Sequence, residues 1–447
     1  MDRRNIMELF DEQKEYLDKR VAEGIEKNRK GKVKIKVTDG FGKALPNVEI
    51  KVRQTNHEFR FGANIFMLDQ LESEQKNERY KQYFVDVFNM ATLPFYWKDT
   101  EPKQYKTRYS KDSEKVYRRP PIDLCMEFCA HNGVEPREHA LAYDLQFPDW
   151  LKGKSDLQVK RELERRYAEI SSRYANDINT IEVTNETFWD NGVTDFYKAP
   201  DFVEWCFKTA EKYFPKNQLG INDATWVWET PCDTTSNYYK LIDKTLKSGA
   251  RIDAVGLQYH MFNRLEEEYQ KTRLILNPKN LYDHLDLYAT FDKPLQITEV
   301  TVPSYSWKPE DEQIQAEIIE RLYSIWFSHP NVEQIIYWNL VDGYAYVSQN
   351  DEKTIRESQG NMSLGENYYH GGLLRFDLTP KPAYYTIKEL IQKKWRTEEN
   401  LRSNQNGEVE FSGFYGDYSL DIVNKDGIMS KNIKFSKKGK NNFEIDI

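Results

Sequence analysis

The sequence predicts an α/β protein: a (β/α)8 TIM barrel with an appended small all-β sandwich formed from both chain ends. Two observations carry this prediction. Strand-like and helix-like stretches alternate through the middle of the 447-residue chain, whereas both ends contain short alternating strands around turns. Eight strand-and-helix units in one domain are typical of a barrel. A doubly wound sheet is the rival, but the sequence lacks the glycine-rich phosphate turn that it would carry after an early strand.

The two chain ends are expected to form an N-terminal helix and one shared sandwich. Residues 1–30 repeat apolar side chains at helical spacing, which predicts a helix. Residues 31–57 alternate polar and apolar side chains on both sides of the turn at 38–43, which predicts a β-hairpin. Residues 398–447 alternate in the same way. Because a lone hairpin is marginally stable in water, we expect 31–57 and 398–447 to form one accessory β-sandwich.

The barrel is expected to span residues 58–397. Amphipathic helical stretches separate most of its predicted strands, which are Phe59–Ile65, Val87–Phe95, Arg137–Tyr143, Thr180–Glu186, Gln218–Asn222, Ile252–His260, Leu295–Val300 and Gln334–Leu340. Functional residues of such barrels lie at the C-terminal ends of the strands. Glu186 ends the fourth predicted strand and Glu299 lies at the end of the seventh, so we expect both at one rim of the barrel.

Composition and charge restrict the classes of partner. The net charge of -8 argues against nucleic acid, since phosphate binding needs a basic surface. No apolar run reaches 18 residues, so no membrane partner is expected. The N-terminus lacks the apolar run of a secretory signal, which indicates a cytoplasmic protein or a chain that begins after a removed signal. Cys125 and Cys129 match no zinc spacing, so we expect all four cysteines, which include Cys206 and Cys232, to be buried free thiols. Neither a metal nor an organic cofactor is expected.

A pair of carboxylates at strand ends suits the cleavage of glycosidic bonds. Glu186 closes I-E-V-T-N-E, and Glu299 lies in P-L-Q-I-T-E-V. One acid can protonate the leaving oxygen while the second attacks or stabilises the anomeric carbon. Aromatic residues reach 14%, which suits a cleft that stacks on sugar rings, although aromatics also fill cores. Taken alone, either glutamate would be an ordinary solvated residue at a strand end.

The predicted barrel resembles family 10 glycoside hydrolases, the β-1,4-xylanases. Six strand-end motifs match in order: E-H-A-L-A-Y-D-L-Q-F-P-D-W (138–150), I-E-V-T-N-E (181–186), G-I-N-D-A (220–224), I-D-A-V-G-L-Q-Y-H (252–260), I-T-E-V (297–300) and I-I-Y-W-N-L-V-D-G-Y (335–344). The ending G-L-L-R-F-D-L-T-P-K-P-A-Y-Y (372–385) also resembles the closing segment of the family.

The resemblance implies a role for each matching residue. Glu186 matches the acid/base and Glu299 the nucleophile of a retaining mechanism. Asn185 matches the residue that bonds the sugar 2-hydroxyl, and Trp338 matches the floor of the cleaved sugar's site. The other implied substrate contacts are the third-strand histidine and the pair beside the nucleophile, namely His139, Gln258 and His260.

Several positions depart from the family pattern. Thr92, Leu93 and Tyr96 stand where the family carries a Glu-Asn pair and a Lys that grip the sugars upstream of the cut. Asp144 replaces a second histidine, and either bonds a sugar hydroxyl or forms a salt bridge with a nearby arginine. Thr301 replaces the Asp that follows the nucleophile by two. We therefore expect intact cleavage machinery and a rewritten glycone pocket.

The expected function is that of a retaining glycoside hydrolase that degrades a plant-type polysaccharide or oligosaccharide, with endo-1,4-β-xylanase as the default. One alternative is another β-glycosidase specificity on the same barrel: glucan, galactan or exo β-xylosidase. The other is a catalytically silent carbohydrate-binding barrel. For the accessory sandwich, bracing of the barrel and binding of polysaccharide are both open, and its few aromatic residues favour bracing.

Overall fold

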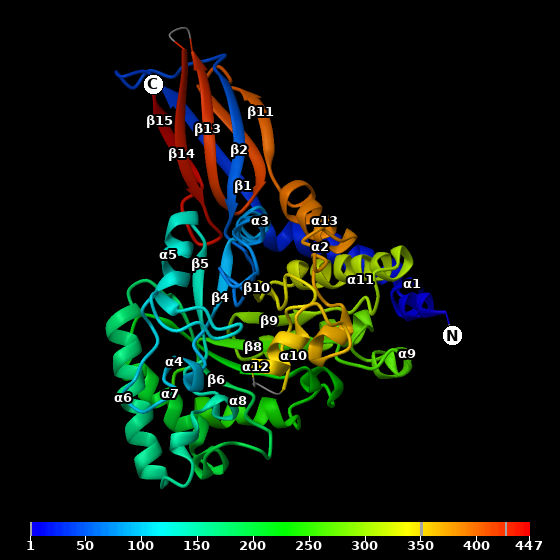
Figure 1. Cartoon of the computed structure of the whole chain (residues 1–447). Coiled ribbons are helices and arrows are strands. Elements are labelled where there is room, and N and C mark those ends of the chain that lie inside the picture. Colours follow the sequence, from blue (N-terminus) through cyan, green and yellow to red (C-terminus); the bar gives the residue numbers. More distant parts are fainter. Residues whose placement is uncertain (1, 349–351, 425–426) are drawn as a thin grey trace.

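The computed structural model describes residues 2–348, 352–424 and 427–447, and its centre is a closed barrel of parallel strands (Figure 1). The strands follow the order β10-β3-β4-β5-β6-β7-β8-β9 around the barrel. Their bounds are Arg60–Asn64 (β3), Met90–Pro94 (β4), Glu135–His139 (β5), Thr180–Asn185 (β6), Gln218–Asp223 (β7), Ala254–His260 (β8), Leu295–Thr301 (β9) and Val332–Tyr337 (β10). Each lies within or overlaps a predicted strand, and the predicted barrel is confirmed.

Helices cover the outside of the barrel and bury their apolar faces against it (Figure 1). Their N-termini carry the expected signals: α6 begins with a capping box of Ser155 and Gln158, and α11 has a proline in its first turn. The main helices are Glu74–Val85 (α3), Ile122–Asn132 (α5), Asp156–Tyr174 (α6), Phe202–Tyr213 (α7), Asn237–Lys247 (α8), Pro278–Ala289 (α10), Pro309–Ser328 (α11) and Pro382–Glu389 (α13), and the short ones are Trp97–Thr100 (α4), Glu268–Lys271 (α9) and Glu352–Ser358 (α12).

Both chain ends build the predicted sandwich, which stands at one end of the barrel (Figure 1). One sheet has the order β12-β1-β15, from Glu408–Phe414, Lys30–Thr38 and Asn442–Asp446. The other has the order β11-β2-β13-β14, from Glu398–Arg402, Glu49–His57, Gly416–Asn424 and Gly427–Phe435. Apolar side chains from both sheets form a separate core. Its aromatic members Phe411, Tyr418 and Phe435 are buried, and Phe414 packs in the core of the barrel, which favours bracing over polysaccharide binding.

The hairpin predicted for residues 31–57 is wrong. β1 pairs with β12 and β15, whereas β2 pairs with β11 and β13, so the two strands lie in different sheets. Val33 and Ile35 of β1 and Ile50 and Val52 of β2 face each other's sheet in the shared core. The alternation correctly indicates one apolar face on each strand. The two faces are buried against each other between the sheets, so β1 and β2 stack and do not pair by hydrogen bonds.

The N-terminal helix consists of three segments that tie the sandwich to the barrel. They are a 3-10 turn at Arg3–Met7, α1 at Glu8–Glu12 and α2 at Lys14–Arg29. α2 packs on α11 so closely that a side chain at Gly24 would meet the Ser328 carbonyl at 2.7 Å. The buried Arg29 guanidinium donates to the carbonyls of Phe327, His329 and Val332. Burial lowers the pKa of Arg29 to about 9.

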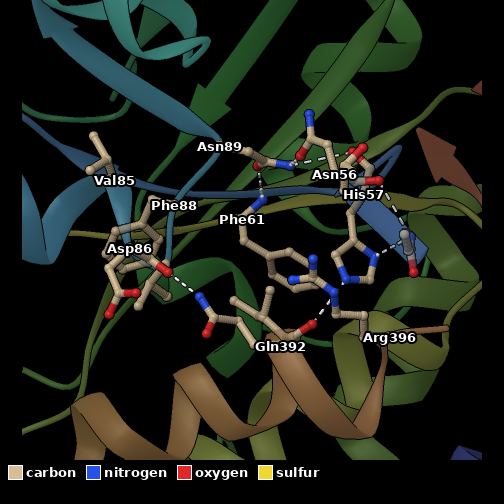
Figure 2. A pocket seen from close by; sticks show the side chains of 13 residues that line it. Asn56, His57, Phe61, Val85, Asp86, Phe88, Asn89, Gln392 and Arg396 are labelled. Atoms are coloured by element: carbon tan, nitrogen blue, oxygen red, sulfur yellow. Dashed lines mark hydrogen bonds between the residues drawn. The ribbon is translucent and has the colours of Figure 1, made fainter. Parts of the chain in front are cut away.

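A small pocket of about 120 Å³ lies where the sandwich meets the barrel (Figure 2). Asn89 accepts from the Phe61 backbone N–H at 2.8 Å and donates to Asn56 at 3.0 Å. His57 contacts the Ile391 carbonyl at 3.0 Å, and burial lowers its pKa to about 4. Because Asn89 precedes β4, this junction lies at the N-terminal end of the strands, opposite the rim where function is expected.

Three of the four cysteines agree with the expectation of burial. Cys125, Cys129 and Cys206 are buried free thiols, but Cys232 is exposed, so the expectation of burial is wrong for that residue. Among the described residues, none of the helices has the length and apolar character needed to cross a membrane.

Candidate active site

Glu186 and Glu299 face one cleft of about 620 Å³ at the C-terminal ends of the barrel strands. Glu186 immediately follows β6, and Glu299 lies near the C-terminal end of β9. Glu299 is 3% exposed, so its carboxyl meets the cleft from a buried position. Asn185, Gln258, His260, His139 and Trp338 line the same cleft.

Glu186 is held at the strand end by three hydrogen-bond donors. Its Oε2 accepts from Tyr143 Oη at 2.8 Å and from Trp189 Nε1 at 2.9 Å, and its Oε1 accepts from Gln258 Nε2 at 3.0 Å. Its φ of 51° lies in the left-handed region, which non-glycine residues seldom adopt. The backbone therefore turns sharply at Glu186 and directs the carboxyl away from the strand and into the cleft.

Glu299 accepts hydrogen bonds from two side chains. Asn222 Nδ2 and His260 Nε2 each approach a different carboxyl oxygen at 3.1 Å. Burial lowers the pKa of His260 to about 4, so the ring is neutral at neutral pH. A neutral ring that donates through Nε2 must accept through Nδ1, and the Thr301 hydroxyl lies 2.9 Å from that atom. Thr301 thus orients His260 without adding the negative charge of the family's Asp.

A continuous chain of amides links the two carboxyls. Asn185 Oδ1 accepts from Asn222 at 2.9 Å and from Gln258 at 3.2 Å. Asn222 also donates to Glu299, and Gln258 also donates to Glu186. All three amides are buried, so their positions fix the carboxyls relative to each other.

The proposed type of reaction predicts the distance between the carboxyl groups of Glu186 and Glu299. A retaining enzyme needs its two carboxyl groups about 5–5.5 Å apart, because one must reach the anomeric carbon while the other reaches the leaving oxygen. A crystal structure of the unliganded protein should show this distance between Glu186 and Glu299. A separation above about 7 Å would instead leave room for a water and indicate inversion.

The carboxyl pair holds a proton near neutral pH. Burial raises the pKa of Glu299 to about 8; the positive charges of His139 and Arg137 oppose this shift, whereas the carboxylates Glu182 and Glu186 add to it. A retaining glycosidase needs an ionised nucleophile, so a nucleophilic role for Glu299 would require its proton to leave when substrate binds.

Glu299→Gln should stabilise the fold at high pH. A carboxyl whose pKa is raised to about 8 by folding costs no stability below its unfolded value, and costs progressively more as the pH rises toward 8. The neutral amide removes this cost. We expect the Tm of the variant to exceed that of the wild type by roughly 2–5 °C at pH 8. Thermal unfolding at pH 4.5 should show a much smaller difference, and a constant difference across this range would contradict the pKa.

His139 belongs to a buried charge network beneath the cleft. Its Nε2 lies 2.9 Å from Tyr96 Oη, and its Nδ1 lies 2.8 Å from Glu182, which also binds Arg137. Burial alone would raise the pKa of Glu182, but the charges of His139 and Arg137 lower it. His139, Glu182 and Glu299 could also bind a cation, because one potential ligand atom of each lies within 4.8 Å of the other two. The existing ion pairs account for this cluster without a metal.

Trp338 forms an aromatic wall of the cleft that contains Glu299. Its ring centroid lies 5.3 Å from that of Phe66, 5.3 Å from His139 and 5.8 Å from His260. Tyr96 packs in the same cluster. The floor role that the resemblance implies for Trp338 stays a prediction.

Asp144 lies outside the residues that line the cleft. Its carboxylate accepts from the backbone N–H groups of Val193 and Thr194 and from the Thr194 hydroxyl. None of these contacts is a salt bridge to an arginine. Asp144 therefore anchors the loop that follows Glu186, and both proposed roles for it, sugar contact and ion pair, lack support in the structure.

Sequence reasoning missed three side chains that contact Glu186 or Glu299. Tyr143 and Trp189 donate to Glu186, and Asn222 donates to Glu299. Tyr143 lies within the same strand-end motif as His139, and Asn222 lies in G-I-N-D-A, so their motifs were recognised without their roles. Trp189 follows Glu186 by three residues in a loop, where no periodic pattern identifies it.

A closed (β/α)8 barrel with two linked glutamates in a cleft at its C-terminal rim defines the class of barrel glycosidases with two catalytic carboxyls. The model of glycosyl hydrolase family 10 matches residues 54–390. The chain belongs to this family.

Relatives of this chain differ in sequence and in length. Endo-1,4-beta-xylanase B of Thermotoga neapolitana is 25% identical over 337 residues, with 71% of this chain and 84% of that protein covered. Anti-sigma-I factor RsgI6 of Acetivibrio thermocellus is 22% identical over 406 residues, with 90% and 46% covered. Endo-1,4-beta-xylanase 2 of Arabidopsis thaliana is 23% identical over 412 residues, with 90% and 33% covered. The chain thus spans less than half the length of the last two.

A solved structure shares the barrel fold. Xylanase 10B from Thermotoga petrophila RKU-1, determined in complex with xylobiose, superposes with a TM-score of 0.59 at 22% identity. The alignment covers 75% of this chain and 95% of that one. The sandwich built from both chain ends lies largely outside the matched family residues.

Proposed function

We propose that this protein is a retaining β-glycosidase that hydrolyses a β-linked polysaccharide or oligosaccharide. The observation that carries the proposal is the chain of buried amides that connects Glu186 and Glu299 within one cleft. Such a chain holds two carboxyls at a fixed separation, which double displacement requires. The family membership and the xylanase relatives support the same class of reaction.

In the first half of the proposed reaction, Glu299 attacks the anomeric carbon while Glu186 protonates the leaving oxygen. A bond forms between the sugar and Glu299, and the glycosidic bond breaks. In the second half, Glu186 removes a proton from water, which displaces Glu299 from the sugar and regenerates both groups. His260 and Asn222 hold the Glu299 carboxylate, since they donate to its two oxygens at 3.1 Å.

Asn185 is positioned to bind the sugar beside the nucleophile. Its Oδ1 is used by Asn222 and Gln258, whereas its Nδ2 makes no hydrogen bond to another described residue. Because Oδ1 accepts from two amides, the orientation of the side chain is set and Nδ2 points elsewhere as a free donor. A bond from Nδ2 to a sugar hydroxyl would strengthen in the transition state, which is the role implied by the resemblance.

The substrate preference is expected to differ from that of an ordinary xylanase. Thr92 and Leu93 are fully buried and do not line the cleft, and Tyr96 bonds His139. These residues cannot replace the polar groups with which the family grips sugar hydroxyls, and the loss of such partners is costly. We expect weak or absent cleavage of unsubstituted linear xylan compared with the Thermotoga neapolitana relative.

A panel of β-linked polysaccharides and aryl β-glycosides with product analysis tests this proposal. Turnover with retention of the anomeric configuration, on a decorated, short or non-xylose substrate, is the expected result. Cleavage of plain xylan at the rate of the relative would contradict the specificity. Sugar binding without any turnover would support a silent carbohydrate-binding barrel instead.

A further inference from the structure

One side of the cleft carries basic residues that the proposed chemistry does not use. Lys98 of α4 and Arg118 and Arg119 of the following loop line the cleft together with Glu186 and Glu299. The three belong to the segment that follows β4. Arg119 pairs with Asp99 at 2.8 Å and covers the Tyr96 ring at 3.9 Å. Within the described part of the chain, Lys98 and Arg118 have no ion-pair partner.

Arg118 is a buried cation without a counter-ion among the described residues. Its side chain is 4% exposed, yet it forms no salt bridge there. Nη1 donates to two neutral acceptors, Asn339 Oδ1 at 2.9 Å and the Tyr344 carbonyl at 2.6 Å. Nε is buried and unpartnered, and Nη2 makes no hydrogen bond to the described residues either. A buried guanidinium in this state is costly, so its retention in a cleft indicates a ligand.

Two further features support this interpretation of Arg118. Its φ of 59° is left-handed, a costly conformation that tends to persist at functional sites. Glu366 lines the same cleft and its charge acts on Arg118, but the carboxylate makes no ion pair with the guanidinium and instead accepts from Asn339 at 3.3 Å. Lys98 also lacks an ion pair or hydrogen bond within the described residues, and burial lowers the pKa of its ammonium.

The basic side of the cleft adjoins the nucleophile. The Arg118 guanidinium lies 5.5 Å from the Phe66 ring centroid, and Phe66 packs on Trp338 at 5.3 Å. Trp338 packs in turn on His260, which bonds Glu299. Arg118 is therefore connected to Glu299 through a series of packed rings along one wall of the cleft, and Lys98 lines the same cleft.

We propose that the substrate carries a carboxylate, as in a uronic acid, on this side of the cleft and that Arg118 and Lys98 bind it. This inference rests on the proposed function and names its substrate class. Nη2 of Arg118, which makes no hydrogen bond to the described residues, can donate to an oxygen of this carboxylate, whereas Nε is buried out of contact with solvent. Lys98 lines the same cleft and adds a second positive charge.

Binding to a catalytically inactive protein tests the inference separately from turnover. In the Glu299→Gln background, calorimetry compares two matched pairs: 4-nitrophenyl β-glucuronide with the β-glucoside, and acidic oligosaccharides from glucuronoxylan with their carboxyl-reduced counterparts. We expect the acidic member of at least one pair to bind about tenfold tighter or more, and the difference to fall with added salt. Equal affinity within both pairs, or no binding of any probe, would overturn the proposal.

Variants then assign the preference to residues. Adding Arg118→Met should remove most of the difference within the preferred pair, and Lys98→Met part of it. Arg161→Met, a matched change at an exposed arginine, should leave the difference intact. A 6-sulfated glucoside serves as a second anion, and preference for sulfate alone would refute the carboxylate. A loss that is equal for acidic and neutral probes in Arg118→Met would also refute it.

Unfolding distinguishes a ligand site from a structural role. Removing an unpaired buried charge should raise the Tm of Arg118→Met or leave it unchanged, whereas a loss of several degrees would identify Arg118 as a structural residue. Should the wild type hydrolyse neutral aryl glycosides while the binding preference is absent, the proposed function stands and this inference fails. Should no glycoside be hydrolysed, the proposed function fails, and the binding data still decide the carboxylate.

Discussion

Glu299→Ala should lower kcat by at least about 10³-fold on any substrate that the wild type cleaves. The reason is that the neighbouring carboxyls are held by other partners: Glu182 is engaged by Arg137 and His139, and Glu186 is held by Tyr143 and Trp189. Steady-state rates with an aryl glycoside measure the loss. Substrate affinity should change much less, because the binding residues of the cleft stay in place.

Azide should partly restore the rate of Glu299→Ala, since the missing carboxylate leaves room for a small anion beside His260 and Asn222. The rescued product should be a glycosyl azide with the configuration opposite to that of the substrate. Glu399→Ala, an exposed glutamate on the sandwich strand β11, is the control and should behave as the wild type with and without azide. A Glu299→Ala protein that keeps more than about a tenth of the wild-type rate would exclude Glu299 as the nucleophile.

The barrel could be predicted because its strands are buried on both faces. Fully buried parallel strands appear as short apolar runs such as Ile335–Tyr337, and amphipathic helices separate them. The ends of these runs place Glu186 and Glu299 at one rim without any knowledge of loops. Periodicity alone was sufficient for the architecture, and the order of the motifs was sufficient for the family resemblance.

Strand pairing in the sandwich could not be predicted in the same way. Alternation shows that a strand has one apolar face, but it does not show which strand lies beside it. β1 and β2 are close in sequence and carry similar patterns, yet they belong to opposite sheets. The partners of β1 lie more than 370 residues later in the chain, which no local pattern encodes.

The directions of individual side chains could not be predicted from the sequence either. Asp144 occupies a strand-end position that matches a family sugar contact, but its carboxylate turns to the loop at Val193 and Thr194. Arg118 and Arg119 lie in a loop whose sequence has no periodic pattern. The backbone of Arg118 itself is left-handed. Position in a motif therefore predicted which residues lie near the cleft better than it predicted what each side chain contacts.

Glu186→Ala should have an effect that depends on the leaving group. In the proposed mechanism Glu186 supplies a proton to the departing oxygen, so its loss should slow glycosides of poorly acidic alcohols by about 10²–10⁴-fold. Dinitrophenyl glycosides, which leave without protonation, should form the glycosyl-enzyme nearly as fast as with the wild type. The second step still needs a base, so the intermediate should accumulate and show a burst of released phenol. Tyr143→Phe removes one donor to Glu186 but keeps the acid, and should show no such dependence on the leaving group. Equal losses on poor and good leaving groups in Glu186→Ala would assign the acid to another residue.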